Sequence, residues 1–198
     1  KEWKLMEKLN GKKINIAVFI SGRGSNLKSL IKHYKKKKST ISIKLVISNN
    51  SKANGLIYAK QAKIKSYVLN FKKNNFIEKK LLKKLLNNNI NLICLAGFMK
   101  ILSKNFIKKF NKPILNIHPS LLPKYKGLNT HIRVIKNKEK YSGATVHLVS
   151  AKLDSGKIIL QKKIKVSKYE NEKSLQKKVL KIEHKLYPKA IKKILISL

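Results

Sequence analysis

The sequence predicts an α/β protein with a Rossmann-like, mostly parallel, twisted sheet, helices on both of its faces, and antiparallel strands in the C-terminal half. Short apolar runs typical of buried strands alternate with stretches whose apolar residues recur every three or four positions. This alternation indicates parallel strands joined by crossover helices, whose ligands bind at the carboxyl ends of the strands. Farther along, two β-rich runs separated by a short turn predict an antiparallel hairpin.

The first strand and helix are the clearest elements. Residues 13–20 read KINIAVFI, a continuous apolar run that ends in the polar, glycine-containing segment 21–26. Apolar residues then recur at helical spacing over 27–34, which predicts a helix. Ser25 or Asn26 is expected to cap its first turn.

The same alternation continues to residue 118. Further strands are predicted where short β-branched or apolar runs occur, and helices where the spacing becomes three or four residues. The predicted strands are 41–47, 66–69, 91–96 and 113–118, and the predicted helices are 53–62 and 77–86.

The C-terminal half departs from this alternation. Two prolines in the loop 119–123 exclude a helix there, and the bond between Leu122 and Pro123 is a candidate for the cis form. The β-rich runs 143–149 and 158–166 predict the hairpin, with a turn at Asp154. Beyond it, an apolar stripe predicts a long C-terminal helix with a bend at Pro188.

We expect one domain over residues 13–198, because no repeat and no flexible linker interrupts the pattern. Residues 1–12 precede it as an N-terminal extension to which we assign no function. No apolar run reaches the roughly 18 residues of a membrane-spanning helix, and the N-terminus lacks the apolar centre of a secretory signal. The single cysteine, Cys94, excludes an internal disulfide. These features predict a cytoplasmic protein without a membrane partner.

The charge admits two interpretations. There are 48 lysine and arginine residues against 8 aspartate and glutamate residues, a formal net charge of +40, which is compatible with a polyanionic partner. However, only Arg23 and Arg133 are arginine, the preferred group for phosphate and base recognition. Lysine, isoleucine and asparagine are in excess together, and A/T-rich codons encode all three. We therefore attribute the charge to codon composition and expect no nucleic-acid partner, while small anionic ligands remain compatible with it.

The segment Gly22-Arg23-Gly24-Ser25-Asn26 joins a predicted strand to a predicted helix. Backbone N–H groups at such a turn point to the positive end of the helix dipole, which suits a phosphate. The segment matches neither the dinucleotide fingerprint nor the P-loop. A glycine turn with an ordinary N-cap is the alternative.

Asn116 and His118 end a predicted strand and, two positions apart, point the same way. An amide can stabilise an oxyanion, and an imidazole can donate to it or transfer a proton near neutral pH. The alternative is a structural histidine. A rigid segment from Pro119 to Pro123 beside the pair favours the functional interpretation.

Asp154 is the only aspartate in the chain. It can be an ordinary turn residue between two strands. If it instead reaches His118, its charge is expected to raise the pKa of the imidazole and hold the cationic form.

The remaining polar candidates carry weaker signals. His33, His147 and His184 are interpreted as structural, and His131 as a residue that could line the cavity. The histidines lack metal-ligand spacing, so no metal site is expected. For Glu183 on the long helix, a solvated position is the ordinary interpretation.

Several segments together resemble the glycinamide ribonucleotide formyltransferases of the folate-dependent formyltransferase superfamily. The resemblance extends from residue 13 to residue 188. The segments that carry it are ISGRGSNL at 20–27, LAGFMKILS at 95–103, LNIHPSLLPKYKGLNTH at 115–131, Val146-His147, LDSG at 153–156 and IILQ at 158–161.

The resemblance implies an enzyme of de novo purine (IMP) biosynthesis. It implies transfer of a formyl group from 10-formyltetrahydrofolate, as co-substrate, to the amine of N1-(5-phospho-D-ribosyl)glycinamide, without a metal. It also implies a phosphate- and nucleotide-binding half over 13–112 and a catalytic and folate-contacting half over 113–198. We expect a monomer or a homodimer.

The resemblance assigns roles residue by residue. Each role rests on a matching segment of this sequence, as follows: Asn116, His118 and Asp154 as catalytic residues; Gly24, Ser25 and Asn26 for the substrate phosphate; Glu183 for the ribose hydroxyls; Met99, Lys100, Ile101, Leu102 and Asn116 for the folate.

Two departures from the family pattern concern binding. Position 129 is asparagine where many members have histidine, and an arginine that touches the folate tail in relatives would fall near Asn74. Both leave the folate affinity open.

Other functions remain as alternatives. A methionyl-tRNA formyltransferase would share the Asn-x-His-Pro-Ser loop but normally carries a further C-terminal domain, for which 198 residues leave no room. A formyltetrahydrofolate hydrolase would share the trio but usually has an extra N-terminal domain. A basic, non-catalytic nucleic-acid-binding protein would leave the trio unexplained.

Overall fold

The structure is a computed structural model that describes residues 13–35, 39–71 and 74–197. The proposed extension at 1–12 lies outside these residues, and the side chain of Asn74 is not described. The seven strands form one mixed sheet in the order β3-β2-β1-β4-β5-β6-β7. This is the predicted fold class. The chain divides into two compact units, one up to Leu115 and one over Asn116–Ser197.

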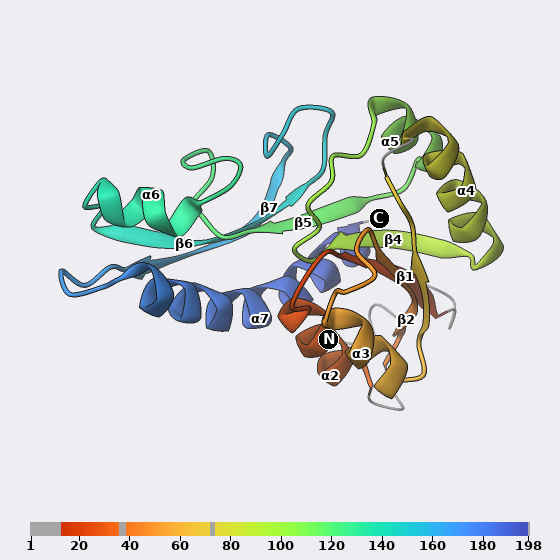
Figure 1. Ribbon diagram of the computed structural model, residues 1–198, viewed down its shortest axis with the longest axis horizontal. Coiled ribbons are helices and arrows are strands. Elements are labelled where there is room, and N and C mark those ends of the chain that lie inside the picture. Colours follow the sequence, from red (N-terminus) through yellow and green to blue (C-terminus); the bar gives the residue numbers. More distant parts are fainter. Residues whose placement is uncertain (1–12, 36–38, 72–73, 198) are drawn as a thin grey trace. The chain divides into compact units, whose positions relative to one another are not determined.

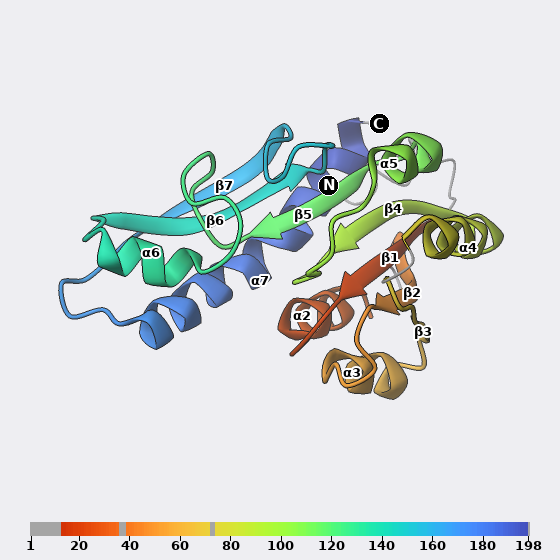
Figure 2. The ribbon, with the colours of Figure 1, turned by 45° about the horizontal axis from the view of Figure 1, so that its top comes forward.

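The first unit contains the parallel part of the sheet. Strand β1 pairs in parallel with β2 and β4, and β2 pairs in parallel with β3. Figures 1 and 2 show α2 and α3 together on one side of these strands and α4 and α5 on the other. The elements are β1 (Ile14–Ile20), α2 (Ser25–Tyr34), β2 (Ile41–Ser48), α3 (Gly55–Gln61), β3 (Lys65–Val68), α4 (Asn74–Asn87), β4 (Ile90–Leu95) and α5 (Lys104–Phe110).

Strand β5 (Ile114–His118) begins at the end of the first unit and leads into the second. The second unit continues with α6 (Thr130–Lys136), β6 (Tyr141–Leu148), β7 (Ile158–Lys165) and α7 (Glu172–Ser197). Strands β6 and β7 form the predicted antiparallel hairpin. Helix α7 packs against both of them and contacts α6. It continues through Pro188.

The core of the first unit explains why its strands read as continuous apolar runs. Five consecutive residues of β1, from Ile16 to Ile20, have no exposed surface. Helices cover both faces of a parallel sheet, so such strands need apolar side chains in both directions. Helix α4 contributes the fully buried Leu81 and Leu85 of the predicted apolar stripe.

Helices α5 and α6 are not predicted by the sequence pattern. Each has only seven residues, so its helical spacing gives a weak signal; α3 is equally short and is the one short helix of the first unit that the pattern does predict. Helix α5 does carry a start signal, because the hydroxyl of Ser103 accepts a hydrogen bond from the Phe106 N–H.

The prediction that Ser25 or Asn26 caps α2 is wrong. The helix begins at Ser25 itself, and Gly24 is the N-cap with a left-handed φ of 71° and no side-chain cap bond. A β-carbon at Gly24 would lie 2.3 Å from the Gly55 Cα, so a side chain does not fit there. The close approach of the turn to α3 therefore requires glycine at position 24.

Candidate active site

Asn116 and His118 lie at the end of β5, where strand alternation turns both toward the same face. Asp154 lies in the turn between β6 and β7. The side chains of His118 and Asp154 are each 7% exposed, and His118 Nδ1 is 3.4 Å from Asp154 Oδ2. Asn116 Nδ2 is 3.4 Å from Asp154 Oδ1. The three residues named as a catalytic trio thus meet at one carboxylate.

The contacts of Asp154 go beyond those of an ordinary turn residue. Its φ is 44°, in the left-handed region that aspartate tolerates better than most residues. Its Oδ2 accepts a hydrogen bond of 2.9 Å from the Gly127 N–H. The carboxylate therefore faces inward, toward Asn116, His118 and a backbone donor, instead of stabilising its own turn.

His147 on β6, interpreted from the sequence as structural, also lies in this cluster. Its Nε2 lies 3.5 Å from Asp154 Oδ1 and 3.2 Å from Asn116 Nδ2, and its side chain is 2% exposed. His147 Nδ1 lies 2.9 Å from the Leu148 carbonyl oxygen. The available signal was the apolar surroundings of a histidine on a strand next to the turn of Asp154.

These contacts fix the orientation of the Asn116 amide. Its nitrogen must face the carboxylate of Asp154, because the amide oxygen there would repel the negative charge. Asn116 therefore presents N–H donors to the centre of the cluster.

The loop after β5 supplies a further contact. His118 Nε2 lies 2.8 Å from the carbonyl oxygen of Tyr125, to which an Nε2–H donates. Both ring nitrogens of His118 thus face oxygen acceptors, so a second proton on the ring would point at Asp154. The bond between Leu122 and Pro123 in this loop is cis.

Burial lowers the pKa of His118 below its usual value of 6.5. The Tyr125 carbonyl and the Asp154 carboxylate act in the opposite direction, but burial and the positive charges of His147 and Arg133 outweigh them. Asp154 thus acts on the pKa of His118 in the expected direction, but burial has the larger effect.

The pKa of Asp154 is lowered, although burial alone would raise it. Burial raises it, but the hydrogen bonds from His147 and from the Gly127 N–H, together with the charges of His118 and His147, lower it to about 2. Asp154 is therefore ionised at neutral pH, next to an imidazole that can accept a proton.

In the first unit, Gly24, Ser25 and Asn26 form the start of α2, as described above. Gly24 and Asn26 are buried, and no acidic residue lies in the first turn of the helix. The backbone N–H groups of this turn can receive an anion.

The segment Met99–Leu102 follows β4 in the same unit. Met99 and Ile101 expose 62% and 68% of their surface, and Lys100 is exposed, whereas Leu102 is 4% exposed. The Met99 N–H donates to the Ser21 hydroxyl over 2.7 Å. The two exposed apolar side chains can contact a flat ring, while Leu102 packs its side chain into the core.

The other candidates are placed as follows. Glu183 on α7 is 7% exposed, so the solvated position considered for it is wrong. His131 on α6 is 8% exposed, and burial lowers its pKa, as it does that of His184 on α7. His33 is exposed on α2.

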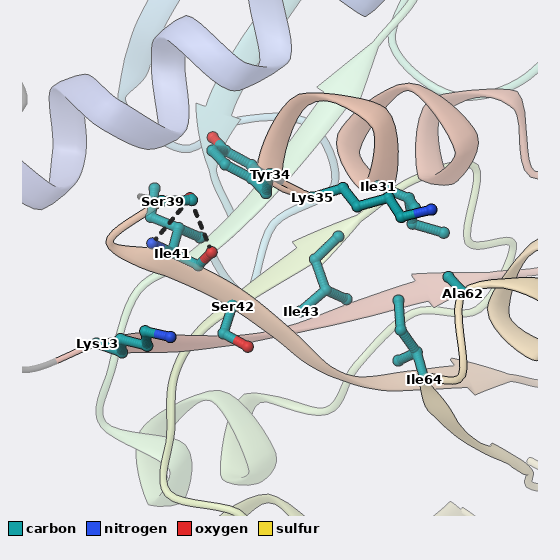
Figure 3. A pocket seen from close by; sticks show the side chains of 10 residues that line it. All are labelled: Lys13, Ile31, Tyr34, Lys35, Ser39, Ile41, Ser42, Ile43, Ala62 and Ile64. Carbon is teal, nitrogen blue, oxygen red and sulfur yellow. Dashed lines mark hydrogen bonds between the residues drawn. The ribbon is translucent and has the colours of Figure 1, made fainter. Parts of the chain in front are cut away.

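A cavity of about 280 Å³ lies elsewhere in the first unit (Figure 3). Ile31, Ile43 and Ile64 line it together with Lys35 and Ser39. None of the described residues that line this cavity is a predicted site residue.

Among the described residues, no group of three or more His, Cys, Asp and Glu side chains is arranged to hold a metal ion. No helix in the part of the chain that the structure describes is long and apolar enough to cross a membrane.

Comparison with known proteins places these observations in context. Residues 14–191 match the sequence model of the family described as "Formyl transferase". The chain is 41% identical over 180 residues to the phosphoribosylglycinamide formyltransferase of Haemophilus influenzae, covering 89% of this chain and 85% of that protein. It is 41% identical over 183 residues to the human trifunctional purine biosynthetic protein adenosine-3, covering 91% of this chain but only 18% of that protein.

Solved structures agree with the sequence relatives. The phosphoribosylglycinamide formyltransferase of Anaplasma phagocytophilum superposes with a TM-score of 0.88 at 40% identity, covering 93% of this chain and 87% of that one. The corresponding enzyme of Brucella melitensis gives a TM-score of 0.87 at 38% identity, covering 93% and 96%.

Proposed function

Because this chain belongs to the formyl transferase family, we propose that it transfers a formyl group from 10-formyltetrahydrofolate to the amine of N1-(5-phospho-D-ribosyl)glycinamide, a step of de novo purine (IMP) biosynthesis. Relatives similar over most of their length are phosphoribosylglycinamide formyltransferases. The observation that carries the proposal is the meeting of Asn116, His118 and Asp154 at one buried carboxylate.

Formyl transfer requires that a site stabilise an oxyanion and move a proton. When the amine nitrogen attacks the formyl carbon, the carbonyl electron pair moves to oxygen and gives a tetrahedral oxyanion. The attacking nitrogen must lose a proton, and the folate nitrogen must gain one before its bond to carbon breaks. The carbonyl then reforms, leaving the amine as its N-formyl derivative and releasing tetrahydrofolate. A competent site therefore needs donors for the oxyanion and a group that moves a proton.

The trio can meet both needs. We assign the oxyanion to the N–H groups of Asn116, as hydrogen-bond donors, and to the positive charge of His118 in its protonated form. A donor of this kind lowers the barrier by roughly 2.7 to 4 kcal/mol in a site that excludes water. Asp154 would stabilise the proton that His118 acquires and would order a water for proton transfer.

The lowered pKa of His118 decides when it acquires that proton. In the resting site the imidazole is neutral, because burial disfavours its charged form. The oxyanion adds a negative charge beside it, which favours protonation. His118 would thus accept a proton as the intermediate forms and release it as the folate departs.

Binding roles follow the family pattern. In the first unit, Gly24, Ser25 and Asn26 would hold the substrate phosphate with backbone and side-chain donors. Met99, Ile101 and the backbone of the segment between Met99 and Leu102 would contact the pterin, with Lys100 beside it. In the second unit, Asn116 would contact the folate and Glu183 would bind the ribose hydroxyls. We further propose a cytoplasmic monomer or homodimer that requires no metal.

A formyl-transfer assay tests the proposal directly. Absorbance is followed as 10-formyl folate is consumed in the presence of glycinamide ribonucleotide, and in parallel with formylatable methionyl-tRNA or without an acceptor. We expect turnover only with the ribonucleotide. Turnover with the tRNA would support the methionyl-tRNA formyltransferase alternative, and consumption without an acceptor would support the hydrolase.

A further inference from the structure

One peptide group, between Lys126 and Gly127, contacts both the site and a surface arginine. Its N–H, on Gly127, donates to Asp154 Oδ2 over 2.9 Å. Its carbonyl oxygen, on Lys126, accepts a hydrogen bond from Arg133 NH1 over 2.7 Å. The two bonds therefore lie at opposite ends of a single planar, conjugated unit.

Several contacts hold Arg133 in position to donate to this peptide group. It lies on α6, and its NH1 also reaches the carbonyl oxygen of Leu128 at 3.5 Å. Its guanidinium carbon lies 5.0 Å from the centre of the Tyr125 ring, a cation–π contact. The guanidinium thus touches the loop at Tyr125, Lys126 and Leu128, on both sides of Gly127.

We propose that Arg133 is a positioning residue for the catalytic carboxylate, which it holds and polarises through the peptide group between Lys126 and Gly127. The inference rests on the proposed function, since it takes Asp154 as catalytic. A cation at the peptide oxygen withdraws electron density from the nitrogen and strengthens the N–H as a donor, as in hydrogen-bond chains that polarise one another. Arg133 does not touch the reacting atoms.

Arg133 also stabilises the backbone partner of His118, the carbonyl of Tyr125. The carbonyl of Tyr125 accepts the hydrogen bond of His118, and Tyr125 has a left-handed φ of 57°. Such a conformation persists in a residue other than glycine only where its surroundings hold it. The Arg133 contact holds one face of the ring, and hydrogen bonds of 2.9 Å join the Tyr125 hydroxyl to Glu139 and Asn137. Arg133 therefore helps fix the backbone partners of both His118 and Asp154.

Lysine cannot replace arginine in this arrangement. An ammonium group is a compact charge with three donors on a flexible stem, whereas the planar guanidinium directs its donors in a fixed geometry and stacks on a ring at the same time. Arg133 is one of only two arginines among 48 basic residues. The geometry gives a reason why this position needs the guanidinium.

The test compares Arg133→Met and Arg133→Lys with a control, Lys136→Met, which removes the same charge from an exposed position of the same helix. The first readout does not depend on activity. Because Asp154 is the only aspartate, ¹³C-labelling of aspartate gives a single carboxyl signal. We expect that signal to titrate at higher pH in Arg133→Met, and the Gly127 amide proton to move upfield, since its hydrogen bond weakens.

The groups that face Asp154 are the same in all variants: His118, His147, the Asn116 amide and the Gly127 N–H. A shift in the Asp154 titration therefore reports the strength of these contacts. In the formyl-transfer assay we expect kcat to fall about 10-fold in Arg133→Met, with KM for both substrates nearly unchanged, by analogy with other hydrogen bonds to charged groups. Arg133→Lys should recover only part of the loss.

The outcomes separate the two proposals. An unchanged Asp154 titration and Gly127 amide signal in Arg133→Met would overturn the inference, as would an equal effect of Lys136→Met. If the wild-type protein transfers no formyl group but the signals shift as expected, the proposed function fails and the positioning of Asp154 by Arg133 stands.

Discussion

His118 and Asp154 come from a strand end and a turn that are distant in the sequence, yet His118 Nδ1 lies 3.4 Å from Asp154 Oδ2 and both side chains are nearly buried. The pair combines an ionised carboxylate with an imidazole whose pKa is lowered by burial. A proton added to this site is stabilised by the carboxylate, and in its absence the imidazole stays neutral. This is the property that a proton-transfer site near neutral pH requires.

Asp154→Asn should nearly abolish formyl transfer and leave binding of the ribonucleotide almost intact. The amide keeps the shape of the carboxylate but cannot stabilise a protonated His118. We expect kcat to fall roughly 10³-fold, the scale on which electrostatic groups act in such sites. Turnover and calorimetric binding should be measured beside Lys152→Gln, an exposed control near the same turn. Undiminished turnover would remove Asp154 from the mechanism.

His147→Phe tests the histidine that sequence analysis took as structural. The ring keeps its volume, but Asp154 loses a hydrogen bond that helps to lower its pKa. We expect the pKa of Asp154 to rise and kcat to fall about 10-fold, with KM little changed. Aspartate ¹³C titration and steady-state kinetics measure the two effects. His33→Phe on α2 is the matched control, and equal losses in both variants would argue against a role for His147.

Ser25→Leu tests the phosphate assignment. A bulky apolar side chain in the first turn of α2 should obstruct an anion and raise KM for the ribonucleotide roughly 10-fold or more, while KM for the folate changes little. Asn26 is less suitable for this test because it is buried. Lys32→Leu, in the last turn of the same helix, serves as the control. Equal losses for both substrates would contradict the assignment.

The stability of the protein should decrease as the pH falls below 6.5. The pKa of His118 is lower in the folded protein than its ordinary value, so the unfolded chain takes up the proton first and unfolding becomes more favourable. The effect ends once the pH passes below the folded pKa. It is at most about 1.4 kcal/mol per pH unit for one histidine. Urea titrations between pH 8 and 5.5 should give a shallower pH dependence for His118→Asn than for wild type, and parallel curves would refute the explanation.

Much of the fold follows from local pattern. The apolar run of β1, the stripe of α4 and the β-rich runs of β6 and β7 can each be recognised from the spacing of apolar residues within one segment. Helices α5 and α6, with seven residues each, carry only a weak pattern of this kind. The N-cap of α2 could not be predicted either, because it depends on the contact between Gly24 and Gly55, which are distant in the sequence.

The site could be predicted in part for a different reason. Asp154 attracts attention because it is the only aspartate, and Asn116 and His118 because strand alternation places them on one face. The contribution of His147, by contrast, depends on how β6 lies beside the turn of Asp154. The direction of the His118 pKa depends on burial, which a single segment of sequence does not reveal.

The contact between Gly24 and Gly55 links the turn before α2, to which phosphate binding is assigned as a proposal, to α3. A β-carbon on Gly55 would lie 2.6 Å from the Ile20 side chain and 3.0 Å from the Gly24 Cα, and the Gly55 N–H donates to the Gly22 carbonyl. An engineer who wishes to enlarge this turn for a bulkier anionic group must therefore redesign α3 at the same time. A library that varies the turn should therefore keep glycine at position 24 unless position 55 and its contacts are varied with it.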